Sequence, residues 1–245
     1  MDGEIAFQLC FPQSDQPHVK SPFRSGFAAA AGVLLLYGCA SSGSKADTAP
    51  AQTANPLVGM AGRQLLIFPA QYLAVANPGG GWDIMPGGPA LLPILDEELA
   101  DVFRRRGIRS NWTFGSDISV MAARNGNLTG NPRQLSVQGI RRIRAGDTPL
   151  PEPLAGEVRG IVALTSARFA VIPLEVHIDT RSNERNGSMR LLLIDTRTAR
   201  VAWADDVIAA PSRDPQMVSE AFSPYGFRML ARELATKFAD MVIPQ

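Results

Sequence analysis

Residues 189–203 read MRLLLIDTRTARVAW, and this stretch predicts a β-hairpin. One apolar run covers 189–195, a second covers 200–208, and the polar residues Thr, Arg, Thr and Ala separate them at 196–199. Two runs rich in strand-forming residues on either side of a short polar segment are typical of antiparallel strands. The stretch therefore predicts that the main sheet of the chain is largely antiparallel.

A further strand is expected just before the hairpin, at 169–180, where side chains alternate in character. One face is predicted to carry Ala170, Ile172, Leu174, Val176 and Ile178, and the other Val171, Pro173, Glu175, His177 and Asp179. Such alternation predicts a half-buried strand. Because Pro has no N–H to donate to a sheet, Pro173 predicts an edge strand or a bulge. Another strand is predicted at 158–164.

Two long amphipathic helices are predicted. At 90–106 the leucines at 91, 95 and 99 share a face with Val102 and Phe103, and Gly107 is the expected C-cap. At 224–242 an apolar stripe follows Ser223 as N-cap and Pro224 as first helical residue.

The remaining elements are shorter. Strands are expected at 65–68, apolar on both faces and so interior, and at 111–114. Residues 77–89 hold five Gly and three Pro, which predicts a loop. Asn131-Pro132 predicts the start of a helix that runs toward 141. This order indicates an α+β fold, a largely antiparallel sheet with helices packed on one face, over residues 63–245.

The hairpin also carries a resemblance. An apolar strand, then Asp195-Thr196, then an apolar strand with Trp203, resembles a hairpin of several envelope lipoproteins. These are the curli-secretion channel lipoprotein, the penicillin-binding-protein activator lipoprotein, and proteins with the fold of the amino-terminal domain of the Tol-Pal β-propeller protein. Ala199 stands where that group has Gly in its turn. The resemblance implies the same fold and a non-enzymatic role in assembling or activating envelope machinery.

The amino-terminal part has the pattern of a signal peptide over residues 1–38. Lys20 and Arg24 precede an apolar run at 26–38, which is shorter than the about 20 residues that span a bilayer. Residues 1–18 are polar and acidic, and Val19 is an alternative start that would leave them untranslated. Residues 39–62 are mostly Ala, Ser, Gly, Thr, Pro and Gln, which predicts a flexible linker.

The end of the apolar run, Leu36-Tyr37-Gly38-Cys39, resembles the lipobox of bacterial lipoproteins. The resemblance implies cleavage between Gly38 and Cys39 and acylation of Cys39, so that covalent lipid is the only prosthetic group expected. Several acyl chains anchor a protein stably to a membrane. Because Ala40 and Ser41 follow Cys39, with no Asp, the sorting rule of such lipoproteins implies the outer membrane, with the domain facing the periplasm.

Composition excludes several functions. The chain has 245 residues, 45% of them hydrophobic and 19% charged, and its net charge is +1. This balance gives no bulk attraction for nucleic acid, and none is expected as a partner. Two cysteines exclude a multi-cysteine zinc site, and two histidines do not favour a His-rich metal site, so no metal is expected.

No catalytic residues are predicted, and we expect the protein not to be an enzyme. His177 between Glu175 and Asp179 has the residue types of a metal or acid–base site, but a solvated strand face is the expected role. The run Gly79-Gly80-Gly81 lacks the spacing of a dinucleotide-binding loop.

Two features are candidates for partner contact. Trp82 stands in the glycine-rich loop, where it either packs on the core or is exposed to a partner. Arg141, Arg142 and Arg144 form the densest basic cluster, which is either a solvated face or a contact with lipid headgroups, anionic glycan or a partner. The sequence thus predicts a lipid-anchored envelope protein that acts as a non-catalytic accessory or scaffolding subunit of a membrane or cell-wall complex. The alternative is a homo-oligomeric component of an outer-membrane secretion or transport assembly.

Overall fold

A computed structural model describes residues 55–77, 80–85, 87–108, 111–143 and 148–243. The strands are β1 Leu65–Ile67, β2 Tyr72–Ala76, β3 Trp82–Ile84, β4 Trp112–Thr113, β5 Thr148–Pro149, β6 Phe169–Asp179, β7 Asn186–Asp195 and β8 Arg200–Ile208. The α-helices are α1 Gly88–Arg105, α2 Gly115–Arg124, α3 Leu154–Val162, α4 Pro215–Ser219 and α5 Pro224–Val242, and 3₁₀ helices cover Met60–Gly62 and Val137–Ile140. Among the helices so described, none has both the length and the hydropathy to cross a bilayer.

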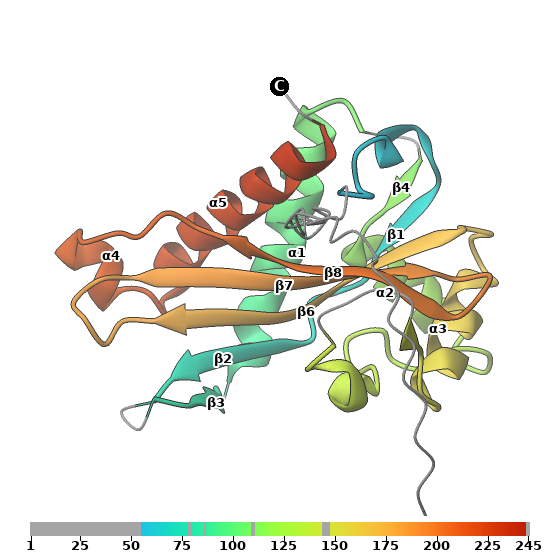
Figure 1. Cartoon of the computed structure of the whole chain (residues 1–245), viewed down its shortest axis with the longest axis horizontal. Helices are drawn as coiled ribbons and strands as arrows, with labels where there is room; N and C mark the ends of the chain where they lie inside the picture. Colours follow the sequence, from blue (N-terminus) through green and yellow to red (C-terminus); the bar gives the residue numbers. More distant parts are fainter. Residues whose placement is uncertain (1–54, 78–79, 86, 109–110, 144–147, 244–245) are drawn as a thin grey trace, which may run out of the picture. The chain divides into compact units, whose positions relative to one another are not determined.

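The strands form one eight-stranded sheet with the order β3-β2-β6-β7-β8-β5 (Figure 1). β6, β7 and β8 are antiparallel neighbours, whereas β1 and β2 both run parallel to β6 and lie end to end along it. β4 extends the sheet beyond β1. This arrangement confirms the α+β fold and the largely antiparallel sheet, and it confirms β1 as an interior strand.

The predicted hairpin is formed by β7 and β8, which meet at the pair Asp195 and Arg200. The carboxylate of Asp195 accepts a hydrogen bond from the N–H of Arg197 at 2.9 Å, which stabilises the turn. Ala199 adopts a left-handed φ of 52°, at the position where the resembling proteins have Gly. An Ala in this conformation costs free energy that a Gly would not.

The predicted alternation along β6 is correct only for its first half. A bulge between Pro173 and Glu175 shifts the register, so the strand is central and Pro173 marks the bulge rather than an edge. Before the bulge, Ile172 packs in one core cluster, whereas Val176 and Ile178 after it pack in the other. The extra residue reverses the side-chain parity, because successive side chains of a strand point to opposite faces.

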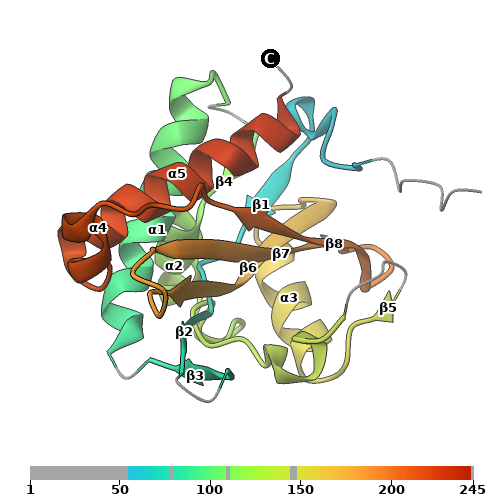
Figure 2. The same ribbon diagram turned by 60° about the vertical axis from the view of Figure 1, so that its left-hand side comes forward.

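The sheet is covered on both faces. α1 and α5 pack on one face, as predicted, and Phe103, Phe227 and Phe238 lie in that core. The other face is covered by α3 and the 3₁₀ helix Val137–Ile140, through residues such as Leu154 and Val158 (Figure 2). This second layer was not predicted, because the segment that forms α3 was expected to be a strand.

Three local predictions are wrong. The strand expected at 158–164 is helix α3, in which Leu154, Val158 and Ile161 fall on one buried face. No α-helix spans 131–141, because the side chain of Gln71 forms hydrogen bonds with backbone groups of Pro132 and Leu135. The loop expected at 77–89 contains strand β3. The helix expected at 90–106 is correct as α1, and Gly107 after it has a φ of 89°.

Candidate binding pocket and the aromatic face beside it

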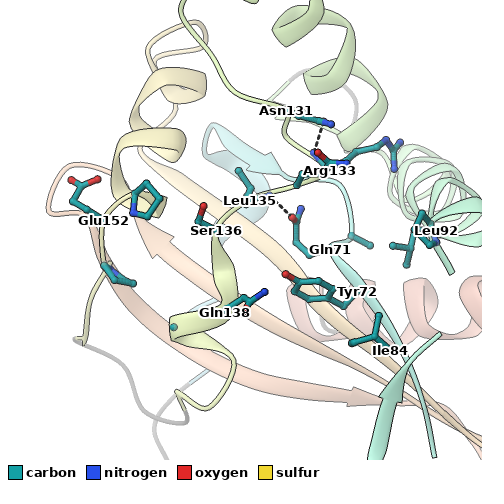
Figure 3. Close-up of a pocket in the computed structure, with 16 residues that line it drawn as sticks. Gln71, Tyr72, Ile84, Leu92, Asn131, Arg133, Leu135, Ser136, Gln138 and Glu152 are labelled. Atoms are coloured by element: carbon teal, nitrogen blue, oxygen red, sulfur yellow. Dashed lines mark hydrogen bonds between the residues drawn. The ribbon is translucent and has the colours of Figure 1, made fainter. Parts of the chain in front are cut away.

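A pocket of about 780 Å³ lies between the β2–β3–α1 side of the domain and the segments around 131–139 and 151–153 (Figure 3). Its apolar walls include Tyr72, Ile84, Pro89, Leu92, Leu135, Pro151 and Pro153, and its polar lining includes Asn131, Arg133, Gln134, Ser136, Gln138 and Glu152. A concave, mostly apolar site with a few polar groups is the usual form of a ligand pocket.

Gln71 builds one wall of this pocket. Its side chain is buried, and its Nε2 donates to the backbone oxygens of Pro69 at 2.6 Å and Pro132 at 2.9 Å. Its Oε1 accepts from the N–H of Leu135 at 2.9 Å. These bonds satisfy backbone groups at 132–135 that a helix would otherwise pair, so the segment forms a wall instead of the predicted helix.

A buried acid supports the same wall from behind. Asp96 of α1 is 2% exposed, accepts a hydrogen bond from the N–H of Ala70 at 3.0 Å and pairs with Arg133 at 2.6 Å. Desolvation raises the pKa of Asp96 to about 6, although the bonds from Ala70 and Arg133 oppose this rise. Asp96 is not among the residues predicted for a site, and its burial makes it a structural part of the pocket.

A series of contacts runs from the pocket across the adjoining sheet face. The guanidinium of Arg141 lies 5.3 Å from the centre of the Tyr72 ring and also pairs with Glu175. Glu175 in turn lies 3.4 Å from Nε2 of His177, and His177 stacks on Trp82 with ring centroids 4.4 Å apart. The series connects the pocket to Trp82.

Glu175 is buried, not solvated as predicted, because β2 and Arg141 cover it. Burial raises the pKa of Glu175, but hydrogen bonds from His177 and Arg141 outweigh this effect and keep the pKa below its ordinary value. The carboxylate is therefore held ionised as the centre of the contact series. Within the described part of the chain, no group of three His, Cys, Asp or Glu side chains could hold a metal ion.

The structure brings two of the predicted contact residues into one region. Trp82 is 44% exposed beside Ile84, and Arg141 reaches the same face through Glu175. Arg142 is exposed to solvent. Arg144 and the predicted cleavage and lipidation residues Gly38 and Cys39 lie outside the described residues.

Sequence reasoning missed Gln71, Tyr72 and Ile84. A polar Gln two residues after Pro69, close to the end of a buried strand, was the only signal, and it does not reveal which backbone groups the side chain will bind. The pocket itself carries no net charge: its two charged lining residues, Arg133 and Glu152, are each paired, with Asp96 and with Arg159. The arrangement suits binding of an uncharged ligand.

No protein-family model matches the sequence, and no curated protein matches it. Solved structures similar to it include the LpoB C-terminal domain from Salmonella enterica, at 10% identity and a TM-score of 0.34, over 62% of this chain and 83% of that one. LpoB from E. coli is 13% identical with a TM-score of 0.33, over 86% and 96%. A PelC dodecamer from Paraburkholderia phytofirmans is 11% identical with a TM-score of 0.33, over 76% and 91%. Likenesses this distant carry no conclusion about function or assembly.

Proposed function

We propose that this protein is a lipid-anchored protein of the cell envelope and a non-catalytic accessory or scaffolding subunit of a membrane or cell-wall complex. The observation that carries the proposal is the sequence Leu36-Tyr37-Gly38-Cys39 at the end of an apolar run that is too short to span a bilayer. Acyl chains on Cys39 would attach the protein to the outer membrane, with its folded domain in the periplasm.

The domain supports a binding role. Its pocket has a largely apolar lining whose two charged residues, Arg133 and Glu152, are ion-paired, and Trp82 and Ile84 are exposed beside it. Exposed aromatic and aliphatic side chains next to a pocket are typical of the contact surface for another molecule. The linker at 39–62 would give the domain reach from the membrane to a partner.

The anchor is tested by changing its cysteine. We expect Cys39→Ser to move the full-length protein from the membrane fraction to the soluble periplasmic fraction, because no thiol remains there to accept lipid. Cys10→Ser is the matched control, since it removes the other cysteine of the chain and should leave the protein in the membrane fraction. A Cys39→Ser protein that stays in the membrane would show that the anchor is elsewhere.

The accessory role is tested by purification. The full chain with a carboxy-terminal tag is extracted in mild detergent, and proteins present in stoichiometric amount are identified. A distinct protein partner supports the accessory role. A large complex of this chain alone would contradict it and favour the homo-oligomeric alternative.

A further inference from the structure

The outward backbone of β3 is unpaired, and the register of β2 with β3 shows which groups are involved. The N–H of Met85 donates to the oxygen of Leu73 at 3.0 Å. Hydrogen-bonded and non-hydrogen-bonded positions alternate along an antiparallel pair. Ile84, one residue before Met85, is therefore at a non-hydrogen-bonded position, and so is Trp82. The N–H and C=O groups of Ile84 and Trp82 point away from β2.

These groups lie at an open edge of the sheet. In the described part of the chain β3 is the last strand on its side, and no backbone segment there pairs with its outer edge. Natural proteins usually protect such an edge with Lys, Pro or a bulge, because an exposed edge can bind another strand. β3 is three residues long and has the charged Asp83 at its centre, yet it displays two large apolar side chains beside the pocket, Trp82 at 44% and Ile84 at 46% exposure.

Both side chains face the side of the sheet on which the pocket opens. Trp82 stacks on His177, and Ile84 lines the pocket with Tyr72 and Pro89. A strand placed along β3 would therefore have one row of its side chains over Trp82 and Ile84 and directed toward the pocket, since alternate side chains of a strand share a face.

Charge selects the kind of strand that fits. Arg133 is held by the buried Asp96, and Glu152 pairs with Arg159 at the exposed rim, so the pocket walls present no unpaired charge. Burying an unpaired charge of the ligand against these walls would cost free energy without a counter-ion to offset it. The site matches a segment with uncharged side chains.

We propose that the outer edge of β3 and the adjoining pocket bind an extended, uncharged segment of a partner polypeptide, which adds to the sheet as a further strand. Backbone hydrogen bonds to Trp82 and Ile84 hold the segment, and an apolar side chain of it enters the pocket. The proposal rests on the accessory function above and names the chemistry of its partner.

The test uses the full-length tagged protein in mild detergent. Dodecapeptides that bind it are selected from a random library on phage, and affinities of the synthetic peptides are measured by fluorescence polarisation. Each backbone nitrogen of a selected peptide is then methylated in turn. If the peptide adds as a strand, methylation should lower its affinity about tenfold or more at alternate positions only, because every second N–H of the peptide faces β3. This readout leaves the protein unchanged.

Variants of the protein test the same backbone hydrogen bonds by changing β3 instead of the peptide. Ile84→Pro removes an outward N–H without removing a bond to β2, and we expect about tenfold weaker binding. Ile84→Ala keeps that N–H and separates the side-chain effect from the backbone effect. Ile208→Ala is the control, because Ile208 is a 67% exposed isoleucine on β8. Circular dichroism and thermal melting check that each variant is folded.

Several outcomes would overturn the proposal. The first is a loss of affinity that does not alternate along the methylated peptides. The second is an unchanged peptide affinity in folded Ile84→Pro. The third is a failure to select any peptide, while cell-wall glycan fragments bind to the protein and Trp82→Ala abolishes the glycan binding. A natural partner that co-purifies equally with wild type and Ile84→Pro would also contradict the inference yet leave the accessory function intact. Failure of the accessory function would instead appear as the absence of any such partner.

Discussion

Arg141 binds the carboxylate of Glu175 at two points, through its Nη2 and through its Nε at 3.2 Å. The carboxylate is buried in the sheet, whereas the Arg141 side chain is about one-third exposed and places its guanidinium over the ring of Tyr72. A side chain from the predicted basic cluster is thus the counter-ion of a buried acid. This role explains why Arg141 and Arg142, adjacent in sequence, should respond differently to mutation.

Arg141→Met should destabilise the domain by about 2 kcal/mol, because it removes one partner of a largely buried ion pair and leaves Glu175 with only His177. Arg142→Ala, at an exposed neighbour, should change the free energy of unfolding by less than about 0.5 kcal/mol. Urea denaturation measures both. The double variant Arg141→Met with Glu175→Gln should recover part of the loss, and a double variant less stable than Arg141→Met would contradict the pairing.

Asp96 should make the domain less stable as the pH rises from about 4 to about 6. Its pKa is raised from the ordinary 3.8 to about 6, so the folded state binds more protons than the unfolded state in this window. By linkage the free energy of unfolding then falls with rising pH, and Asp96 accounts for about 3 kcal/mol of this fall. Above pH 6 the contribution of Asp96 no longer changes with pH.

The measurement is the difference in unfolding free energy between wild type and Asp96→Asn at several pH values. This difference should change between pH 4 and pH 6 and stay constant above. Asp101→Asn, which removes a carboxylate at an exposed site of the same helix, serves as the control. A pH-independent difference for Asp96→Asn would show that the raised pKa is wrong.

Gln71→Ala should cost about 3 kcal/mol, because it removes three hydrogen bonds and leaves the buried backbone groups of Pro132 and Leu135 without their partner. Gln138→Ala changes an exposed glutamine of the same pocket and should cost less than about 0.5 kcal/mol. Hydrogen exchange of the Leu135 amide provides a local measurement. Unchanged protection of that amide in Gln71→Ala would refute the role of Gln71 in holding the wall.

Gly187→Ala should destabilise the packing of α5 on β7 by about 1–3 kcal/mol. A methyl group at this position would overlap the side chain of Leu230, which is fully buried in the core. Gly62→Ala is the control, because a methyl group there meets no other atom of the described chain. Thermal unfolding compares the two, and equal melting temperatures would mean that α5 is packed less closely than described.

The sequence by itself determined the elements whose signals are local. The β7–β8 hairpin, the apolar faces of α1 and α5, and the caps at Gly107 and Ser223 depend on residues close together in the chain. The end of the apolar run at Gly38-Cys39 is equally local, and it predicts the anchor without reference to the fold.

Tertiary structure decided what depends on distant partners. α3 contains two glycines, Gly156 and Gly160, which lower its helix propensity, yet packing of Leu154 and Val158 against the sheet makes it helical. The bulge after Pro173 reversed the faces of β6, and the bonds of Gln71 replaced a predicted helix with a pocket wall. Local propensity is a fraction of a kilocalorie per residue, whereas burial and buried hydrogen bonds are each worth more, so long-range contacts prevail where the two disagree.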